Sequence, residues 1–484
     1  MMDFRPVGYV IGLFLLGLGA LMLAPALLDA VSSTGKGGWR AFVVSFTLTV
    51  LVGGALTLGC YNGRQERLQV DQAMLMVAAS WMIVPLFGAL PFMLGKGALP
   101  PVDAIFEAVS GLTTTGSTVM QRLGVQPPGL LLWRALLQWI GGIGIIVFGI
   151  AFLPSLRLGG LQLFRTEGFD ADGSSLGKAR DIAASIFLLY IGLTAACALV
   201  YGACGMEALD AVSHAMTTLA TGGFANYDSS FGGFSPSAQY ACVLFMILAS
   251  LPFLRFIDLI RDDARRMLQD PQIQAFLAVA LVVWVMLLAS RAAVSDAPFE
   301  TSMRETLFNS VSILTGTGYS TANYNDWGPF AVTTFFIIGL IGGCAGSTCC
   351  SVKVFRYQIL GAVALAEIRR LRRPNGVFTA RFGGKRVGSD VVTSVLVFFF
   401  VFIISLALLS LGLTATGLDA VTAISGAATA LAHVGPGLGE TIGPIGNFES
   451  LDDSAKMLLI LGMLLGRLEL LGVLALLSPD FRRR

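Results

Sequence analysis

Long apolar stretches alternate with short polar ones along the chain. Those that begin at Val7 (VGYVIGLFLLGLGALMLAPALL) and Val391 (VVTSVLVFFFVFIISLALLSLGL) carry no charged residue. Each exceeds the ~20 residues that a helix needs to cross a bilayer, so both are predicted to be membrane spans. The pattern predicts ten spans in all, at residues 7–30, 39–59, 72–95, 130–153, 182–203, 238–257, 273–290, 328–364, 390–412 and 455–478.

Composition supports the membrane interpretation. Charged residues make up 13% of the 484 residues and hydrophobic residues 55%, whereas soluble proteins carry about 25% charged residues. The first apolar run is longer than the core of a signal peptide and lacks an A-x-A cleavage site, so it is interpreted as the first span. A net charge of +2 gives no indication of nucleic-acid binding.

Cysteine and histidine usage limits the possible chemistry. The seven cysteines form no C-x-x-C pair, and most lie in apolar runs, where they are interpreted as small buried hydrophobic residues. Two histidines, His214 and His433, exclude a site built from several histidines.

The distribution of Lys and Arg predicts the topology. Loops after odd-numbered spans hold few basic residues, whereas loops after even-numbered spans are basic. By the positive-inside rule, both termini are therefore predicted to be cytoplasmic. The basic loop residues are Arg64, Arg67, Arg157, Arg165, Lys178, Arg180, Arg255, Arg261, Arg265, Arg266, Arg369, Arg370, Arg372, Arg373, Arg381, Lys385 and Arg386, and the tail ends in Arg482, Arg483 and Arg484.

Four weaker apolar stretches on the outer side repeat one pattern. They read DAIFEAVSGLTTTGST, DAVSHAMTTLATGGFA, ETLFNSVSILTGTGYS and TAISGAATALAHVGPG, and they align without gaps on a glycine. Leu stands four residues before each glycine and Ser or Thr six before it. An acid stands thirteen residues before three of them. The glycines are Gly116, Gly223, Gly318 and Gly435, the acids Asp103, Asp210 and Glu305, with Thr422 and nearby Asp419 in the fourth segment.

Each of these segments is interpreted as a short helix followed by an extended, glycine-centred turn. The acid suits the helix N-terminus by capping and by the helix dipole. The helix is too short to cross, so its partially negative C-terminus points into the membrane. Extended backbone is tolerated there only inside protein or beside water. Four such units around one axis predict a cation site made of backbone carbonyls.

With these features the chain resembles the Trk/Ktr/HKT superfamily of potassium transporters, and within it the TrkH-type membrane subunits. The resemblance covers essentially the whole chain. It rests on the four repeats and on the motifs TTTGST, TGTGYST, VGPGLG, GGCAGSTCCSVK and GRLELL. The fold it implies is an all-α polytopic membrane protein with four pseudo-symmetric span–pore-helix–span repeats around one central pore. An N-terminal helix pair precedes them.

This organisation divides the chain into five parts. Residues 1–68 form the N-terminal two-helix domain, followed by pore repeat 1 at 69–160 and pore repeat 2 at 161–268. Pore repeat 3, at 269–372, contains an interrupted second span, and pore repeat 4 occupies 373–484.

The resemblance implies a K⁺ filter that binds through main-chain carbonyls. A glycine at Gly116 goes with K⁺ preference in this superfamily, and a serine there with Na⁺ transport. His433 departs from the asparagine expected in TrkH-type chains. Its side chain is interpreted as packing behind the filter, with pH sensitivity as the alternative. The implied filter residues are Thr113, Thr114, Thr115, Gly116, Ala220, Thr221, Gly222, Gly223, Thr315, Gly316, Thr317, Gly318, Ala432, His433, Val434 and Gly435.

The interrupted eighth span and Arg467 are the candidate gate. A charge in the middle of a span needs a partner, and Glu469, two residues away, faces another side of the helix. Arg467 is therefore either one half of a structural ion pair or a cation barrier held by carbonyls of Gly342–Ser351. The resemblance favours the barrier, with a loop that obstructs the pore. The gate residues are Gly342, Gly343, Cys344, Ala345, Gly346, Ser347, Thr348 and Arg467.

The function expected from all this is K⁺ uptake across the bacterial inner membrane, passive or in symport with H⁺, without enzymatic chemistry. The alternatives are a secondary transporter for another cation such as Na⁺, and an intramembrane enzyme, which the two isolated histidines argue against. The resemblance also implies a homodimer and a cytosolic Trk-type regulatory subunit that binds nucleotide, docked at residues 367–390. This chain has no nucleotide motif, and K⁺ is its substrate.

Overall fold

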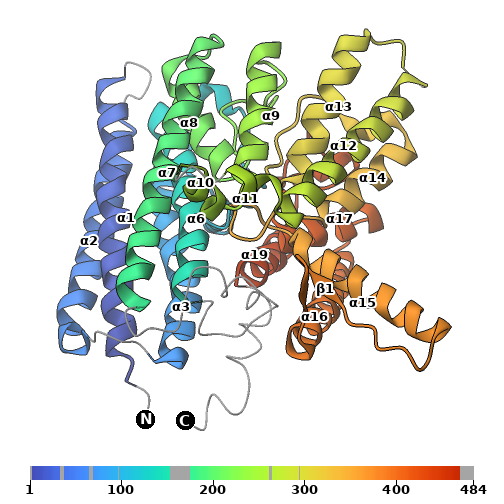
Figure 1. Ribbon diagram of the computed structural model, residues 1–484. Coiled ribbons are helices and arrows are strands. Elements are labelled where there is room, and N and C mark those ends of the chain that lie inside the picture. The colour runs from blue at the N-terminus through green and yellow to red at the C-terminus, as the bar shows by residue number, and fades with distance from the viewer. Residues whose placement is uncertain are drawn as a thin grey trace.

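The protein is described by a computed structural model, which covers residues 3–32, 37–64, 69–95, 97–152, 175–260, 264–293 and 295–468. It is an all-helical bundle with one two-residue hairpin, β1 (Arg381–Phe382) and β2 (Lys385–Arg386) (Figure 1). Arg67, Arg157, Arg165, Arg261, Glu469 and the three C-terminal arginines lie outside the described residues.

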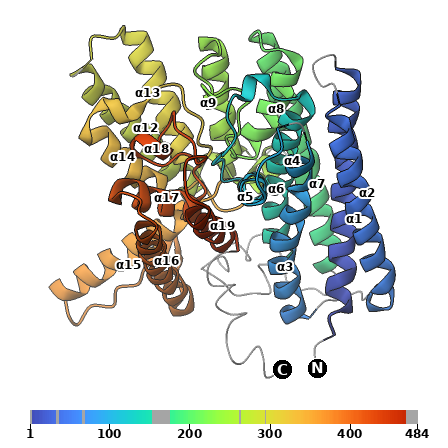
Figure 2. The same ribbon diagram turned by 180° about the vertical axis from the view of Figure 1, so that it is seen from behind.

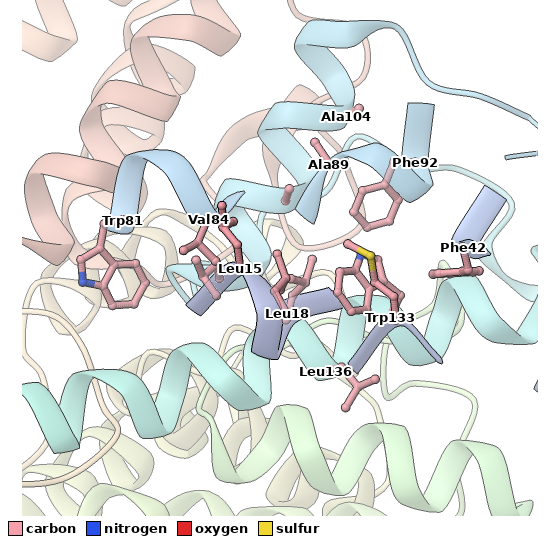
Figure 3. Close-up of a cluster of buried hydrophobic side chains, with 14 of the residues drawn as sticks. Leu15, Leu18, Phe42, Trp81, Val84, Ala89, Phe92, Ala104, Trp133 and Leu136 are labelled. Atoms are coloured by element: carbon pink, nitrogen blue, oxygen red, sulfur yellow. The ribbon is translucent and has the colours of Figure 1, made fainter. Parts of the chain in front are cut away.

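The N-terminal helices pack against the first repeat. Helices α1 (Arg5–Val31) and α2 (Trp39–Gly59) form an antiparallel pair. Their buried side chains join those of α3 (Val70–Gly88), α4 (Leu90–Leu94) and α6 (Pro128–Phe152) in one cluster (Figure 3). Leu15 and Leu18 from α1 and Trp133 from α6 all belong to this cluster. Burial of such large apolar side chains fixes the pair onto the pore-forming part.

Four short helices lie between pairs of longer ones, as the repeat predicts. They are α5 (Pro101–Leu112), α8 (Ala208–Leu219), α13 (Phe299–Leu314) and α17 (Ala420–Ala432), here called the pore helices. The flanking helices are α3, α6, α7 (Ser175–Ala203), α9 (Pro236–Ser250), α12 (Pro271–Ala292), α14 (Pro329–Gly339), α15 (Val354–Arg372), α16 (Ser389–Ala415) and α19 (Asp453–Arg467), of which α14 has 11 residues because its span is interrupted. Shorter elements are η1 (Tyr61–Gly63), η2 (Leu123–Val125), η4 (Tyr324–Trp327), α10 (Phe253–Ile260), α11 (Ala264–Leu268) and α18 (Gly439–Ile442).

Six helices of the described residues are long and apolar enough to cross a membrane, and a bent pair adds a seventh candidate. The six are Arg5–Val31, Trp39–Gly59, Asp71–Leu94, Asp181–Ala203, Pro271–Ala292 and Ser389–Ala415. The predicted span at 455–478 begins as α19, and its second half lies outside the described residues.

The predicted span at 238–257 is present as a bent pair of helices that together are long and apolar enough to cross a membrane. Helix α9 ends at Ser250, and the chain turns by 95° into α10. Pro252 explains the break, because proline has no backbone N–H to donate and its ring clashes with the preceding helical turn. The bend leaves the carbonyls of Ala249 and Ser250 free to accept hydrogen bonds from outside the helix.

The predicted interruption of the eighth span is confirmed. Helix α14 ends at Gly339 and α15 begins at Val354, so residues between them form a loop. A parallel bridge pairs Ile341 with Val352 at the neck of this loop. The segment Gly342–Ser351 is here called the gate loop.

The predicted role of the acids at pore-helix N-termini holds in part. Asp103 and Asp210 lie in the first turns of α5 and α8, and Asp419 caps α17 by accepting a hydrogen bond from the Thr422 backbone N–H at 3.1 Å. Glu305 is the exception, because α13 begins at Phe299 and places Glu305 in its interior. There it pairs with Arg291 of α12 at 2.5 Å instead.

The last repeat closes against the first. Helix α19 packs on both α17 and α5, and it lies between the two halves of the bundle in Figure 2. Lys456 of α19 forms a buried ion pair with Asp103 of α5 at 2.6 Å. The four pore helices are thereby held around one axis.

Candidate selectivity filter and gate

A short non-helical segment follows each pore helix, and the same two positions have a positive φ in all four segments. They are Thr113–Gly116, Ala220–Gly223, Thr315–Gly318 and Ala432–Gly435, here called the filter strands. Each has a positive φ at its terminal glycine, from +76° to +102°. The residue two before the glycine also has positive φ in every strand: Thr114 (+56°), Thr221 (+49°), Gly316 (+71°) and His433 (+56°).

This shared conformation is costly for the residues that adopt it. A positive φ places Cβ too close to the backbone and costs about 1–2 kcal/mol in residues other than glycine. Thr114, Thr221 and His433 all bear that cost, and only Gly316 avoids it. Strain of this kind persists where the surroundings impose it, as functional sites do.

The filter strands form a closed ring of close backbone contacts. A Cβ placed on Gly116 would lie 2.2 Å from the carbonyl oxygen of Gly222, and one on Gly223 would lie 1.9 Å from that of Thr317. The same construction puts Gly318 2.0 Å from the Val434 oxygen and Gly435 3.2 Å from the Thr115 oxygen. Each glycine therefore abuts the next repeat, in the order 1, 2, 3, 4 and back to 1. Glycine is required both for its positive φ and for this approach.

Most filter-strand carbonyls are buried without a hydrogen-bond donor. Within the described part of the chain, no donor reaches the carbonyls of Thr114, Thr221, Gly316 or His433, the layer two residues before the glycines. The exceptions elsewhere in the strands are the carbonyls of Ala220, Gly222, Ala432 and Gly435. A buried carbonyl with no donor is unfavourable, and a dehydrated cation is a ligand that satisfies it.

A cavity opens directly outside the ring. All four terminal glycines, Gly116, Gly223, Gly318 and Gly435, line it. Asp228 also lines this cavity, and its carboxylate accepts a hydrogen bond from the Leu123 N–H at 3.3 Å. The cavity therefore leads to the mouth of the ring.

Side chains behind the strands fix their carbonyls. Gln138 of α6 donates to the Gly222 carbonyl at 2.6 Å and accepts from the Phe224 N–H at 3.0 Å. Ser117 donates from its hydroxyl to the Gly435 carbonyl at 2.7 Å, which joins repeats 1 and 4.

His433 lies behind the ring. Its Nδ1 is 2.7 Å from the Thr115 hydroxyl, and the side chain is buried, as the packing interpretation expects. No hydrogen-bond partner of its Nε2 occurs among the described residues. A Cβ added to Gly466 of α19 would lie 2.8 Å from that Nε2, so the His433 imidazole packs against α19.

A buried ion pair braces the segments after the first two strands. Glu107 of α5 pairs with Arg134 of α6 at 2.8 Å, and both side chains are almost fully buried. Arg134 also donates to the Ala225 carbonyl at 2.7 Å, and Glu107 accepts from the Val119 N–H at 3.0 Å. The pair thus links the exit of strand 1 to that of strand 2.

The gate loop lies against the inner end of the filter strands. Ser351 donates from its N–H to the Ala432 carbonyl at 2.8 Å and from its hydroxyl to the same oxygen at 2.9 Å. The Cys350 sulfur is 3.5 Å from the Thr114 hydroxyl. A Cβ on Gly316 would lie 3.9 Å from the Ser351 hydroxyl. The loop thus touches strands of repeats 1, 3 and 4.

The other end of the gate loop is tied to the bend after α9. Cys344 donates its N–H to the Ser250 carbonyl at 3.0 Å, and Thr348 donates its hydroxyl to the Ala249 carbonyl at 3.0 Å. The Phe253 N–H donates to the Gly346 carbonyl at 2.9 Å. The carbonyls released by the bend are therefore used to position the loop.

Arg467 contacts the gate loop, although not through the expected atoms. Its Nη1 donates to the Cys350 sulfur at 2.8 Å, and its Nη2 donates to the carbonyl of Gly141 in α6 at 2.7 Å. The guanidinium also lies over the Trp81 ring, 5.0 Å from its centroid. The expectation that loop carbonyls hold Arg467 is wrong, because the loop group that accepts its hydrogen bond is the Cys350 thiol and not a carbonyl. The cation near the loop carbonyls is Lys353, whose ammonium contacts the Cys349 carbonyl.

Sequence reasoning missed the residues that support the site. Gln138 and Arg134 are polar residues within a predicted span, and such residues mark functional positions. That signal could have identified both.

Together, the fold and the ring of carbonyls define a membrane protein of the pore-forming cation transporter class. Residues 39–480 match the family model described as "TrkH: Cation transport protein". The chain therefore belongs to the TrkH family of cation transport proteins.

Relatives and a solved structure agree over nearly the whole chain. It is 44% identical over 415 residues to the Trk system potassium uptake protein TrkI of Halomonas elongata, covering 85% of this chain and 84% of that one. It is 33% identical over 497 residues to the Trk system potassium uptake protein TrkH of Escherichia coli, covering all of both chains. The crystal structure of the potassium transporter TrkH from Vibrio parahaemolyticus superposes with a TM-score of 0.90 at 32% identity, over 99% of this chain and 100% of that one.

Proposed function

We propose that this protein takes up K⁺ across the bacterial inner membrane through a filter of backbone carbonyls. The observation that carries the proposal is the closed ring of glycine–carbonyl contacts, with the layer formed by Thr114, Thr221, Gly316 and His433 left without donors. Its relatives are named as potassium uptake proteins.

In this account the chemistry is exchange of ligands. K⁺ sheds water at the outer cavity and is coordinated by carbonyls of the filter strands, which replace its hydration shell. The C-termini of the four pore helices add their partial negative charge at the inner end. No covalent step is involved, so the protein acts as a transporter.

We further propose that the gate loop and Arg467 close the path below the filter. The loop lies directly under strands of repeats 1, 3 and 4, and Arg467 fixes it through Cys350. The guanidinium keeps its charge at all physiological pH values. A fixed positive charge on the path repels a cation that leaves the filter.

The orientation of the transporter in the membrane is inferred from the distribution of its basic residues. Both termini are inferred to be cytoplasmic, and the exposed basic residues of the 367–390 segment are inferred to face the same side. We propose that this segment receives a cytosolic Trk-type regulatory subunit carrying the nucleotide, and that two copies of the chain form a homodimer. Transport then responds to a signal bound outside this chain.

Ion flux into proteoliposomes tests the proposal. Purified protein in vesicles loaded with K⁺ should take up ⁸⁶Rb⁺, and external K⁺ should compete far better than external Na⁺. Empty vesicles provide the control. Equal competition by Na⁺ and K⁺ would favour the Na⁺ transporter alternative and count against a K⁺ filter.

A further inference from the structure

The Ala432 carbonyl is held by the gate loop. It belongs to the innermost layer of the filter, at the C-terminal end of pore helix α17. Both donors that reach it come from Ser351, the N–H at 2.8 Å and the hydroxyl at 2.9 Å. The corresponding carbonyls of Thr113 and Thr315 accept no hydrogen bond from the described residues, and that of Ala220 accepts one from the neighbouring Thr221 hydroxyl at 2.8 Å. One ligand of the inner layer is thus occupied by the loop itself.

Contacts on both sides of Ser351 hold it next to the Ala432 carbonyl. It has a positive φ of +60°, which costs energy in a residue with a side chain. Its hydroxyl also lies 3.1 Å from the Gly339 carbonyl at the end of α14. The adjacent Cys350 is fixed by Arg467. The strained residue is therefore anchored on both sides, and its N–H and its hydroxyl both lie within hydrogen-bond distance of the Ala432 oxygen.

We propose that Ser351 couples the gate loop to the inner K⁺ site, an inference that rests on the proposed function. While the loop is in place, two donors compete with K⁺ for the Ala432 carbonyl, and the ion lacks one ligand. Displacement of the loop releases this carbonyl and restores the ligand. By linkage, K⁺ at the inner site favours the displaced loop by the same factor. Ser351 is a positioning residue in this scheme, since it touches the ligand and not the ion.

Equilibrium K⁺ binding tests the coupling with a matched control in the same loop. Ser347 donates its hydroxyl to the Cys344 carbonyl at 2.7 Å, inside the loop. Ser347→Ala therefore removes one hydrogen bond inside the loop and leaves both Ser351 donors at the Ala432 carbonyl. Ser351→Ala removes one donor from the Ala432 carbonyl, and Ser351→Gly does so while relieving the strained φ. Two substitutions at one position guard against a variant that fails to fold.

The measurement is calorimetric titration of K⁺ into the purified full-length protein, in buffer without other alkali cations. Both Ser351 variants should bind K⁺ about threefold to tenfold more tightly than the wild type, which corresponds to one net hydrogen bond. Ser347→Ala should bind K⁺ as the wild type does. In ⁸⁶Rb⁺ uptake, the Ser351 variants should show a lower KM.

Failure of the coupling and failure of the filter give different results. Wild-type affinity in both Ser351 variants, with normal K⁺ binding by the wild type, would overturn the coupling alone. An equal gain in affinity in Ser347→Ala would also overturn it, because the gain would then not depend on the Ser351 donors. A wild-type protein that does not prefer K⁺ to Na⁺ would overturn the proposed filter and this inference with it.

Discussion

Arg467 donates a hydrogen bond to the sulfur of Cys350 at 2.8 Å, which joins the last helix to the gate loop. The same guanidinium donates to the Gly141 carbonyl of α6. One side chain therefore connects repeats 1, 3 and 4 below the filter strands. Nothing on its own helix within the described residues shares this role.

Removal of the guanidinium should release the loop. Arg467→Ala is expected to raise basal ⁸⁶Rb⁺ flux about tenfold or more, because a hydrogen bond to a charged group contributes about 1.5–3 kcal/mol. Arg467→Lys should raise it less, since one ammonium does not reproduce the guanidinium fork. Flux that falls or stays level in correctly folded Arg467→Ala would make Arg467 a structural residue.

Cys350 offers a matched pair of substitutions at the other end of this contact. Cys350→Ser keeps an acceptor for the Arg467 guanidinium, whereas Cys350→Ala removes it. Basal flux should rise in the alanine variant and stay near the wild-type level in the serine variant. Equal flux in the two variants would show that the sulfur contact does not hold the loop.

The glycines of the ring should differ in their tolerance of a side chain. A Cβ on Gly318 would meet the Val434 oxygen at 2.0 Å, whereas one on Gly435 would lie 3.2 Å from the Thr115 oxygen. Gly435→Ala should therefore bear mainly the strain of positive φ, about 1–2 kcal/mol. Gly318→Ala should in addition distort the strand and lose K⁺/Na⁺ discrimination. Competition of Na⁺ with ⁸⁶Rb⁺ uptake measures this order, and the reverse order would contradict the ring.

The substitution Gly116→Ser tests the ring of filter strands from repeat 1. The added side chain would meet the Gly222 carbonyl, since its Cβ lies 2.2 Å from that oxygen. Gly116→Ser should let Na⁺ compete more strongly with ⁸⁶Rb⁺. An unchanged selectivity series at normal expression would count against Gly116 as a filter residue.

The buried pair Glu107–Arg134 should carry stability rather than selectivity. Glu107→Ala leaves a buried guanidinium without its carboxylate and should cost about 3–5 kcal/mol. The pair Arg304–Glu300 is the control, because its Glu300 carboxylate is exposed and screened by solvent, so Glu300→Ala should cost little. Thermal unfolding of the purified variants in detergent compares the two. Similar losses of stability in both would contradict a special role for burial.

The lowered pKa of the Asp419 carboxyl predicts that the cap of α17 depends on pH. Hydrogen bonds from the Thr422 side chain and backbone hold the pKa of the Asp419 carboxyl below its ordinary value of 3.8. Because the folded-state pKa is lowered, the stabilisation is present above pH 3.8 and is lost as the pH falls through the folded-state value. Asp419→Ala should therefore melt earlier than the wild type at neutral pH, and the difference should shrink in acid. A difference that is independent of pH would exclude the charged cap.

The repeat in the sequence predicted the ring because its signal is local. A glycine, a leucine and a hydroxyl at fixed spacing recur in each segment, and the same backbone follows in each. The partner of Arg467 was not predictable in this way. Cys350 lies in a different repeat, and its contact depends on where the gate loop turns.

Two features that the patterns did not predict had visible causes in the sequence. Pro252 bends the predicted span at 238–257, and a search for apolar length alone passed over it. Glu305 aligned with the other acids, but α13 extends to Phe299, beyond the region that the repeat shares. The alignment matched the position of Glu305 to the other acids, but it did not account for the greater length of α13.

Anomalous scattering tests the central claim most directly. Crystals of the protein grown in Rb⁺ or Tl⁺ should show anomalous peaks on the axis of the four filter strands, bounded by the carbonyls of Thr114, Thr221, Gly316 and His433. Crystals grown in Na⁺ provide the control. Peaks at that layer are the result that the ring of free carbonyls predicts. Ordered filter strands with no peak on their axis, and Rb⁺ or Tl⁺ bound elsewhere in the protein, would contradict it.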